Sequence, residues 1–254
     1  MSAHELESLI QMLRSGGPDL AAPPPKAREN FEAMLAGIPI SDDVAFESRT
    51  LGGVPVRWST TLGAQPGRVL LYLHGGAYVV GSTLGYRALS SALARSAGAR
   101  GLALDYRLAP ENPFPAAVDD ALAAYRALLA QGTSPGSIAI AGDSAGGGLT
   151  VAMLIAARDA GLPMPAAALA ISPWADLACV GASFSTKAAQ DPSLNREGLL
   201  AMAGLYLNGG SPLSALASPV YGDLAGLPPL LVQVGSAEVL LDLSLIHISE
   251  PTIP

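Results

Sequence analysis

Short apolar runs alternate with longer stretches of helical spacing from about residue 68 onward. The runs are rich in Val, Leu, Ile and Ala, a composition typical of strands buried on both faces of a parallel sheet. Repeated strand-then-helix units predict an α/β fold, with a mostly parallel sheet covered by helices on both faces. The expected strands are residues 69–73, 101–104, 138–141, 166–171 and 230–234, and the expected helices are about 84–97, 115–130 and 145–160.

Different patterns precede and interrupt this rhythm. Residues 3–14 and 26–37 have helical spacing, and the Ala/Pro run at 21–25 between them predicts a stiff linker. Residues 43–50 and 54–61 alternate apolar and polar around Gly52-Gly53, which predicts a hairpin at a sheet edge. Residues 175–227 contain a helix candidate at 197–207 and a Gly/Pro/Ser-rich segment, so we expect an insertion over the edge where open α/β sheets bind ligands.

Composition narrows the function classes. The 254 residues carry 14 basic and 21 acidic side chains, a net charge of −7 that disfavours nucleic-acid binding. No apolar stretch is long and unbroken enough to predict a membrane span. No metal-ligand cluster or phosphate-binding loop is evident, so no cofactor is expected. Cys179 has no partner for an internal disulfide, and residues 1–14 lack the apolar core of a secretory signal. We therefore expect a cytoplasmic protein.

The strongest chemical signal is Gly142-Asp143-Ser144-Ala145-Gly146. This G-x-S-x-G pentapeptide follows an expected strand and opens an expected helix, which is the context of a nucleophile elbow. A chance match in a glycine-rich chain is the alternative, but the flanking strand and helix favour the elbow. Ser144 is the predicted nucleophile.

A glycine loop, His74-Gly75-Gly76-Ala77-Tyr78, directly follows the strand at 69–73. Backbone N–H groups in such a loop can stabilise the oxyanion of a tetrahedral intermediate. We predict Gly75 and Gly76 as donors, with the amide of Ala145 completing the hole. A plain turn is the alternative. His74 lies upstream of the serine, so it is expected to orient the loop rather than to act as base.

Three motifs occur in order: 73–78 with Gly81-Ser82, 105–111 with 114–117 and Asp119, and 142–147. Together, from about residue 25 to about residue 242, they resemble the hormone-sensitive-lipase-like family of α/β-hydrolases, whose bacterial members are carboxylesterases. The resemblance implies a serine carboxylesterase acting on small esters with short or medium acyl chains, with His74 and Asp143 in supporting roles. It also implies that residues 1–40 and 175–227 form a cap on a core at 41–242, that 105–111 braces the site, and that a homodimer is an option for the full-length protein.

The triad acid should come soon after the strand at 230–234, because the order in this fold is Ser, then Asp/Glu, then His. Glu238 occupies the matching position, although Val239 stands where the family usually has proline. A glutamate can hold an imidazole in the needed tautomer as an aspartate does. Asp242 is the second candidate, and a solvated face is the alternative for both.

The triad histidine is missing from its expected place. Of His4, His74 and His247, only His247 follows Glu238, at a distance too short for the helix and strand that the family places between them. From about residue 243 the family pattern stops, so 243–254 is predicted to be a non-native tail, such as translated read-through, and the base to lie outside the sequence. Because a serine without its base is a weak nucleophile, we expect this chain to be impaired.

Two other functions remain open from the sequence. A non-catalytic protein that binds a small ligand on the same fold would explain the missing histidine, but not the intact elbow and glycine loop. The plant gibberellin receptor, which is similar to this family, shows such a conversion. An amidase or peptidase would share the same machinery and differ only in substrate.

Overall fold

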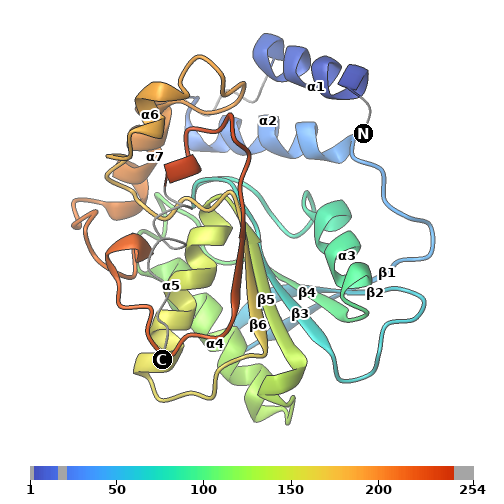
Figure 1. Cartoon of the computed structure of the whole chain (residues 1–254). Helices are drawn as coiled ribbons and strands as arrows, with labels where there is room; N and C mark the ends of the chain where they lie inside the picture. Colours follow the sequence, from blue (N-terminus) through green and yellow to red (C-terminus); the bar gives the residue numbers. More distant parts are fainter. Residues whose placement is uncertain (1–2, 17–21, 243–254) are drawn as a thin grey trace.

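The computed structural model describes residues 3–16 and 22–242, and within them a seven-stranded sheet with helices on both faces (Figure 1). The strand order is β1-β2-β4-β3-β5-β6-β7, with parallel pairing from β4 through β7 and antiparallel pairing at β1-β2 and β2-β4. This confirms the α/β class. The strands are β1 Ala45–Leu51, β2 Val54–Thr60, β3 Val69–Leu73, β4 Arg100–Leu104, β5 Ile138–Asp143, β6 Ala167–Ile171 and β7 Leu230–Gln233.

Helix α3 covers one face of the sheet, and α4 and α5 cover the other (Figure 1). All five residues of β3 are buried, as expected for a central parallel strand. Helix α5 is apolar around most of its circumference and almost completely buried, because it packs against β5, β6 and α4. The helices are α1 Ala3–Gly16, α2 Pro24–Ala36, α3 Arg87–Ser96, α4 Ala116–Ala130, α5 Ala145–Asp159, α6 Ser183–Thr186 and α7 Arg196–Leu207, with 3-10 turns η1 Pro135–Ser137 and η2 Pro219–Tyr221.

Most predicted elements occur within a few residues of their expected bounds. The hairpin β1-β2 turns at Gly52 and Gly53, both at positive φ. The predicted linker at 21–25 is wrong at its end, because Pro24 and Pro25 form the first turn of α2. A proline there costs little, since the first N–H groups of a helix have no partner inside it. Helix α3 begins at Arg87, after a turn in which the Tyr86 amide donates to the Ser82 carbonyl.

Helices α2 and α7 lie over the carboxyl ends of the central strands (Figure 1). The Arg28 guanidinium on α2 donates to the carbonyls of Val79 and Ala109, which follow β3 and β4. The Phe114 amide donates to the carbonyl of Tyr206 on α7 at 2.7 Å. These contacts place α2 and the segment between β6 and β7 at the carboxyl ends of the central strands.

No helix in residues 3–16 and 22–242 is long and apolar enough to cross a membrane. The same residues bring together no group of three His, Cys, Asp or Glu side chains that could hold a metal ion. Cys179 is buried. Strand β7 pairs only with β6 in the described part of the chain, and its Leu231 side chain is 64% exposed.

Candidate active site

Ser144 occupies a sharp turn between β5 and α5. Its φ of +52° and ψ of −120° are strained for a residue with a side chain, which is the backbone signature of a nucleophile elbow. A Cβ at Gly142 would meet the Gly146 carbonyl, and a Cβ at Gly146 would meet the carbonyls of Leu73 and His74. The two motif glycines therefore let the elbow pack against the end of β3. Ser144 itself is half-buried, at the N-terminus of α5.

The loop after β3 presents backbone N–H groups beside this elbow. Gly76, Ala77 and Tyr78 have φ values of +115°, +53° and +63°, and the amides of Val79 and Val80 donate back to the Gly76 carbonyl. Within the described residues, the amides of Gly76, Ala77 and Ala145 have no acceptor. Such groups can receive a developing oxyanion.

Gly75 differs from the free donor that the sequence predicts. Its N–H donates to Oδ1 of Asp143 at 2.9 Å. A side chain at this position would collide with the Asp143 carboxylate and with the Tyr86 hydroxyl, 2.7 Å from an added Cβ. The glycine is needed for close packing, and the next two amides, those of Gly76 and Ala77, have no acceptor among the described residues. The sequence gives no sign of the left-handed backbone at Ala77, which makes its amide a further candidate donor.

Asp143 fastens the loop to the elbow. Its carboxylate accepts from the Tyr72 hydroxyl at 2.5 Å and the Tyr86 hydroxyl at 3.0 Å, besides the Gly75 amide. Burial raises the pKa of Asp143, and the three hydrogen bonds act in the opposite direction. Burial, reinforced by the charge of Asp143, raises the pKa of Tyr72 and Tyr86 well above 10.0, so both phenols stay donors.

His74 is 1% exposed and sits between two aromatic rings, 4.3 Å from the Tyr106 centroid and 5.5 Å from that of Tyr86. Its Nδ1 lies 2.7 Å from the Gly75 carbonyl oxygen, which fits a tautomer with the proton on Nδ1. Burial lowers the pKa of His74, so the ring is neutral. Nε2 has no hydrogen-bond partner in the described part of the chain. These contacts fit a residue that shapes the loop and not a base for Ser144.

Glu238 lies just beyond β7, at the carboxyl ends of the parallel strands, where Ser144 also lies. Its Oε1 accepts from the Ser172 hydroxyl and the Gly235 amide, both at 2.8 Å. Among the described residues no donor contacts its Oε2, so one oxygen can still accept an imidazole N–H. Asp242 is differently engaged, because its Oδ2 accepts from the Ser183 amide at the start of α6 at 2.7 Å.

The described histidines do not supply the base. His4 is exposed on α1, and its carbonyl accepts from the Ser8 hydroxyl. His247 lies outside the described residues.

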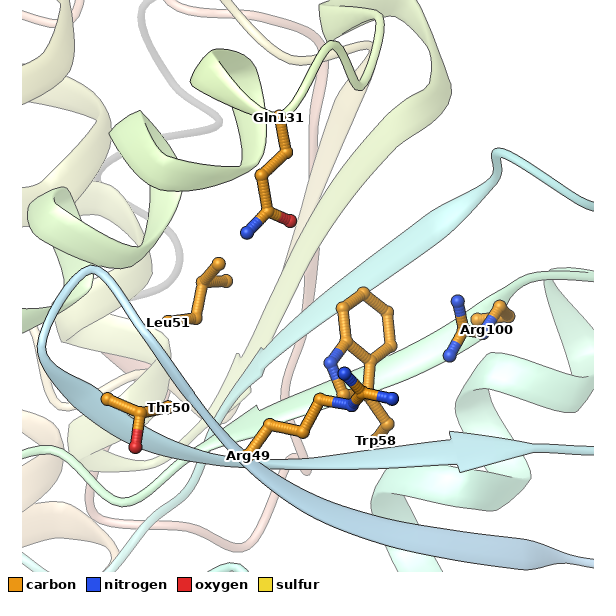
Figure 2. A pocket seen from close by; sticks show the side chains of 6 residues that line it. All are labelled: Arg49, Thr50, Leu51, Trp58, Arg100 and Gln131. Atoms are coloured by element: carbon orange, nitrogen blue, oxygen red, sulfur yellow. The ribbon is translucent and has the colours of Figure 1, made fainter.

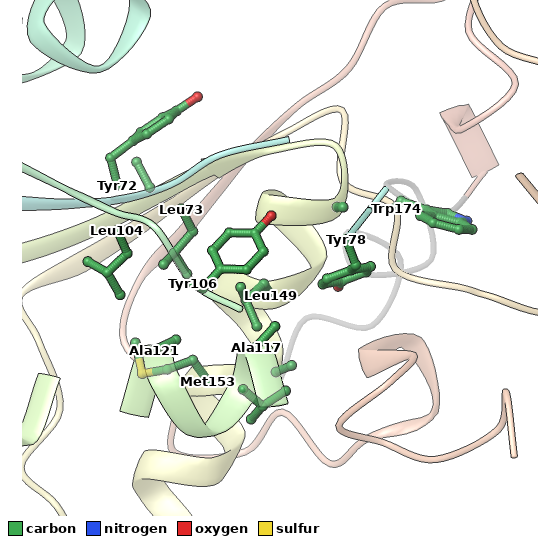
Figure 3. Packing of buried hydrophobic residues seen from close by; sticks show 14 of the residues in the cluster. Tyr72, Leu73, Tyr78, Leu104, Tyr106, Ala117, Ala121, Leu149, Met153 and Trp174 are labelled. Carbon is green, nitrogen blue, oxygen red and sulfur yellow. The ribbon is translucent and has the colours of Figure 1, made fainter. Parts of the chain in front are cut away.

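An aromatic stack joins helix α7 to the glycine loop. The ring of Tyr206 on α7 stacks on Tyr78 with centroids 3.9 Å apart and planes 6° from parallel, and Phe114 packs edge-on against Tyr206. The ring of Trp174, after β6, lies tilted beside Tyr78 with centroids 6.3 Å apart (Figure 3). All three large rings, Tyr78, Trp174 and Tyr206, are buried. Helix α7 therefore packs directly on Tyr78, the residue that follows the candidate oxyanion donors.

Comparisons with known proteins identify the family to which the chain is similar. The family described as alpha/beta hydrolase fold matches residues 70–245. An acetyl-hydrolase from Streptomyces hygroscopicus is 56% identical over 217 residues, which cover 85% of this chain and 70% of that protein. The carboxylesterase NlhH from Mycobacterium tuberculosis is 34% identical over 230 residues, covering 84% and 70%. The crystal structure of an esterase from the bacterial hormone-sensitive lipase family has 49% identity and a TM-score of 0.92, covering 97% of this chain and 83% of that one.

Proposed function

This chain belongs to the hormone-sensitive-lipase-like branch of the α/β-hydrolase family, and we propose that it hydrolyses carboxylic esters through an acyl-enzyme on Ser144. The observation that carries the proposal is the strained Ser144 elbow, fastened through Asp143 to a loop with unoccupied N–H groups. An ordinary surface serine would need neither the strain nor the adjacent donors.

The Ser144 hydroxyl attacks the ester carbonyl carbon while a base removes its proton. The amides of Gly76, Ala77 and Ala145 hold the oxyanion of the tetrahedral intermediate, and the N-terminus of α5 adds a favourable dipole. The base then gives its proton to the leaving alcohol, and the acyl group remains on Ser144. Water, deprotonated by the same base, releases the acid in a second tetrahedral step.

Glu238 is the proposed acid, because it lies at this edge with Oε2 open and with Oε1 held by two donors. An imidazole donating to Oε2 would be fixed in the tautomer that accepts the serine proton. His74 and His4 do not fill this place, so the described residues do not contain the base. We propose that the chain of 254 residues turns over slowly, since loss of a triad histidine costs on the order of 10⁶ in kcat.

The insertion and the N-terminal helices form the cap that determines which acyl chains fit the site. Phe184, Leu205 and Tyr206 are the candidate cap residues, of which Phe184 and Tyr206 are buried. We propose small esters with short or medium acyl chains as substrates, a cytoplasmic location and, for the full-length protein, a homodimer.

The test is hydrolysis of p-nitrophenyl butyrate with and without added imidazole, together with labelling by a fluorophosphonate probe. We expect slow hydrolysis that imidazole accelerates, because the free base can replace the missing side chain. Ser144→Ala should abolish both the hydrolysis and the labelling, after the reaction of free imidazole is subtracted. His247→Ala should change neither rate.

Each other outcome is informative. Loss of hydrolysis in His247→Ala would identify that residue as the base. Fast hydrolysis without imidazole that survives His247→Ala would contradict the proposed impairment. No labelling and no Ser144-dependent hydrolysis, with or without imidazole, would contradict the esterase and favour a ligand-binding protein on this fold.

A further inference from the structure

A pocket lies beside the antiparallel end of the sheet, away from Ser144. Its volume is about 320 Å³. Ser144 follows the last residue of β5, whereas Arg100 is the first residue of β4 and Gln131 follows the last residue of α4. These two residues place the pocket toward the opposite ends of the parallel strands. It is lined by Arg49, Thr50, Leu51, Trp58, Arg100 and Gln131 (Figure 2).

The strand register gathers Arg49, Trp58 and Arg100 on one face of the sheet. Glu47 pairs with Trp58 across β1 and β2, and Trp58 pairs with Leu102 across β2 and β4. Arg49 and Arg100 are each two residues from such a pair along their strands, so they share the face of Trp58. Helix α4 packs against the hairpin at Gly52, where the Ala123 carbonyl of α4 leaves no room for a side chain. The helix ends at Ala130, before it covers this face.

The two guanidinium groups are differently engaged. The Arg49 guanidinium pairs with Glu47 at 2.6 Å. The Arg100 guanidinium lies over the Trp58 ring, 4.3 Å from its centroid, with Nε 3.4 Å from the Thr60 hydroxyl. In the described part of the chain, the Nη groups of Arg100 have no acceptor. Two arginines and one glutamate leave one positive charge in excess, in a protein of net charge −7.

The rest of the lining carries no charge and combines polar Thr50 and Gln131 with Leu51 and Trp58. Leu51 faces Trp58 across the opening, and the Gln131 amide points toward it from the end of α4 (Figure 2). A planar carboxylate matches a guanidinium fork, and an apolar body matches the indole edge and the leucine. A multiply charged phosphate is a poorer match, because Glu47 already neutralises one of the two arginines and would repel it.

We propose that this pocket binds a small monocarboxylate with an apolar body, with its carboxylate on Arg100 and its body between Leu51 and Trp58. A volume of about 320 Å³ is at the small end of ligand pockets, which fits a molecule the size of phenylacetate. The indole orients the guanidinium before the ligand arrives, which lowers the entropy cost of binding.

The experiment is a titration of the chain with phenylacetate, followed by tryptophan fluorescence and calorimetry. Trp58 reports on the pocket directly, and Trp174, the other tryptophan, is fully buried near the elbow. We expect saturable binding with a Kd on the order of 1 mM. Arg100→Leu should weaken binding about tenfold or more, Arg100→Lys should weaken it less, and Trp58→Phe should remove the fluorescence change.

Arg87→Leu is the matched control, because Arg87 also lies over an aromatic ring, that of Phe46, at 6.0 Å but outside the pocket. It should bind phenylacetate as the parent does. Phenylacetamide and inorganic phosphate should bind at least about tenfold more weakly than phenylacetate. Equal binding of either would overturn the proposal, as would binding that Arg100→Leu and Arg100→Lys leave unchanged. Binding that Ser144→Ala alone weakens would place the ligand at the elbow and overturn it too.

Discussion

At the scale of single residues, Asp143 is the side chain that fastens the loop after β3 to the elbow. One carboxylate accepts from the Gly75 amide and from the hydroxyls of Tyr72 and Tyr86. Asp143→Asn keeps the shape but replaces one acceptor oxygen with a donor, which faces a hydroxyl or an amide that also donates. We expect the rate of fluorophosphonate labelling at Ser144 to fall about 10- to 100-fold, and stability to fall by about 1–3 kcal/mol. Asp119→Asn, at an exposed position on α4, should leave the labelling rate within about twofold. An unchanged labelling rate in Asp143→Asn would show that the loop holds its shape without this carboxylate.

His74 makes stability depend on pH. Because burial lowers the pKa of His74 in the folded chain, the unfolded chain binds a proton at a higher pH, near the ordinary 6.5. Stability due to this residue is therefore complete above about pH 6.5 and is lost as the pH falls below it, by up to about 1.4 kcal/mol per pH unit. Denaturant unfolding between pH 7.5 and about 5 measures the effect. His74→Gln, which does not titrate, should have a flatter profile than the parent, and equal slopes would contradict this.

The amides of Gly75 and Ala77 show the limit of what a motif predicts at this scale. The motif predicts a free N–H at Gly75, whereas in the structure that N–H is occupied and the N–H of Ala77 has no acceptor among the described residues. The Ser144 elbow and the position of the glycine loop could be predicted, because tight turns leave a clear trace in glycine spacing. Which amide of the loop is already occupied depends on Asp143, 68 residues from Gly75 along the chain. No local pattern records such a contact.

At the scale of elements, helix α2 is fastened to the site by one arginine. The Arg28 guanidinium donates to the carbonyls of Val79 and Ala109 at 2.8 Å and forms a two-point contact with Glu111. Arg28→Ala would leave two carbonyls without a partner. We expect hydrogen exchange in α2 and in the loop after β3 to accelerate, and stability to fall by about 1.5–3 kcal/mol.

Lys26→Ala on the same helix is the control for this prediction. Lys26 forms an exposed ion pair with Glu29, and such pairs contribute little. The hydrogen-exchange rates of Lys26→Ala should match those of the parent. If Arg28→Ala and Lys26→Ala behave alike, apolar packing of Phe31 and Leu35, and not Arg28, holds the helix.

The elements themselves were largely predictable, since buried parallel strands and amphipathic helices have distinct periods. The start of α2 was not, because Pro24 and Pro25 read as linker residues until the first turn of the helix accepts them. How α7 docks was also not predictable. Its Tyr206 stacks on Tyr78, and neither ring's partner follows from its own sequence neighbourhood.

At the scale of the whole molecule, the two edges of the sheet differ. Strand β1 is the edge on one side, where Arg49 and Glu47 form an exposed ion pair on the edge strand itself. Charged side chains on an edge disfavour pairing with another chain. Within the described residues, β7 is the other edge, and it is four residues, Leu-Leu-Val-Gln, without a charge.

An uncharged edge with Leu231 64% exposed should pair with a second copy of the chain. We expect concentration-dependent self-association in sedimentation velocity, and Leu231→Lys should shift the distribution toward monomer, because a lysine on the edge opposes strand pairing. Leu213→Lys removes a leucine of similar exposure, 59%, from a loop outside the sheet. It should leave the distribution as in the parent, which separates edge pairing from a general gain in solubility. Equal shifts in the two variants would attribute the association to apolar surface as such, and a parent that stays monomeric at high concentration would show that β7 is not an accessible edge.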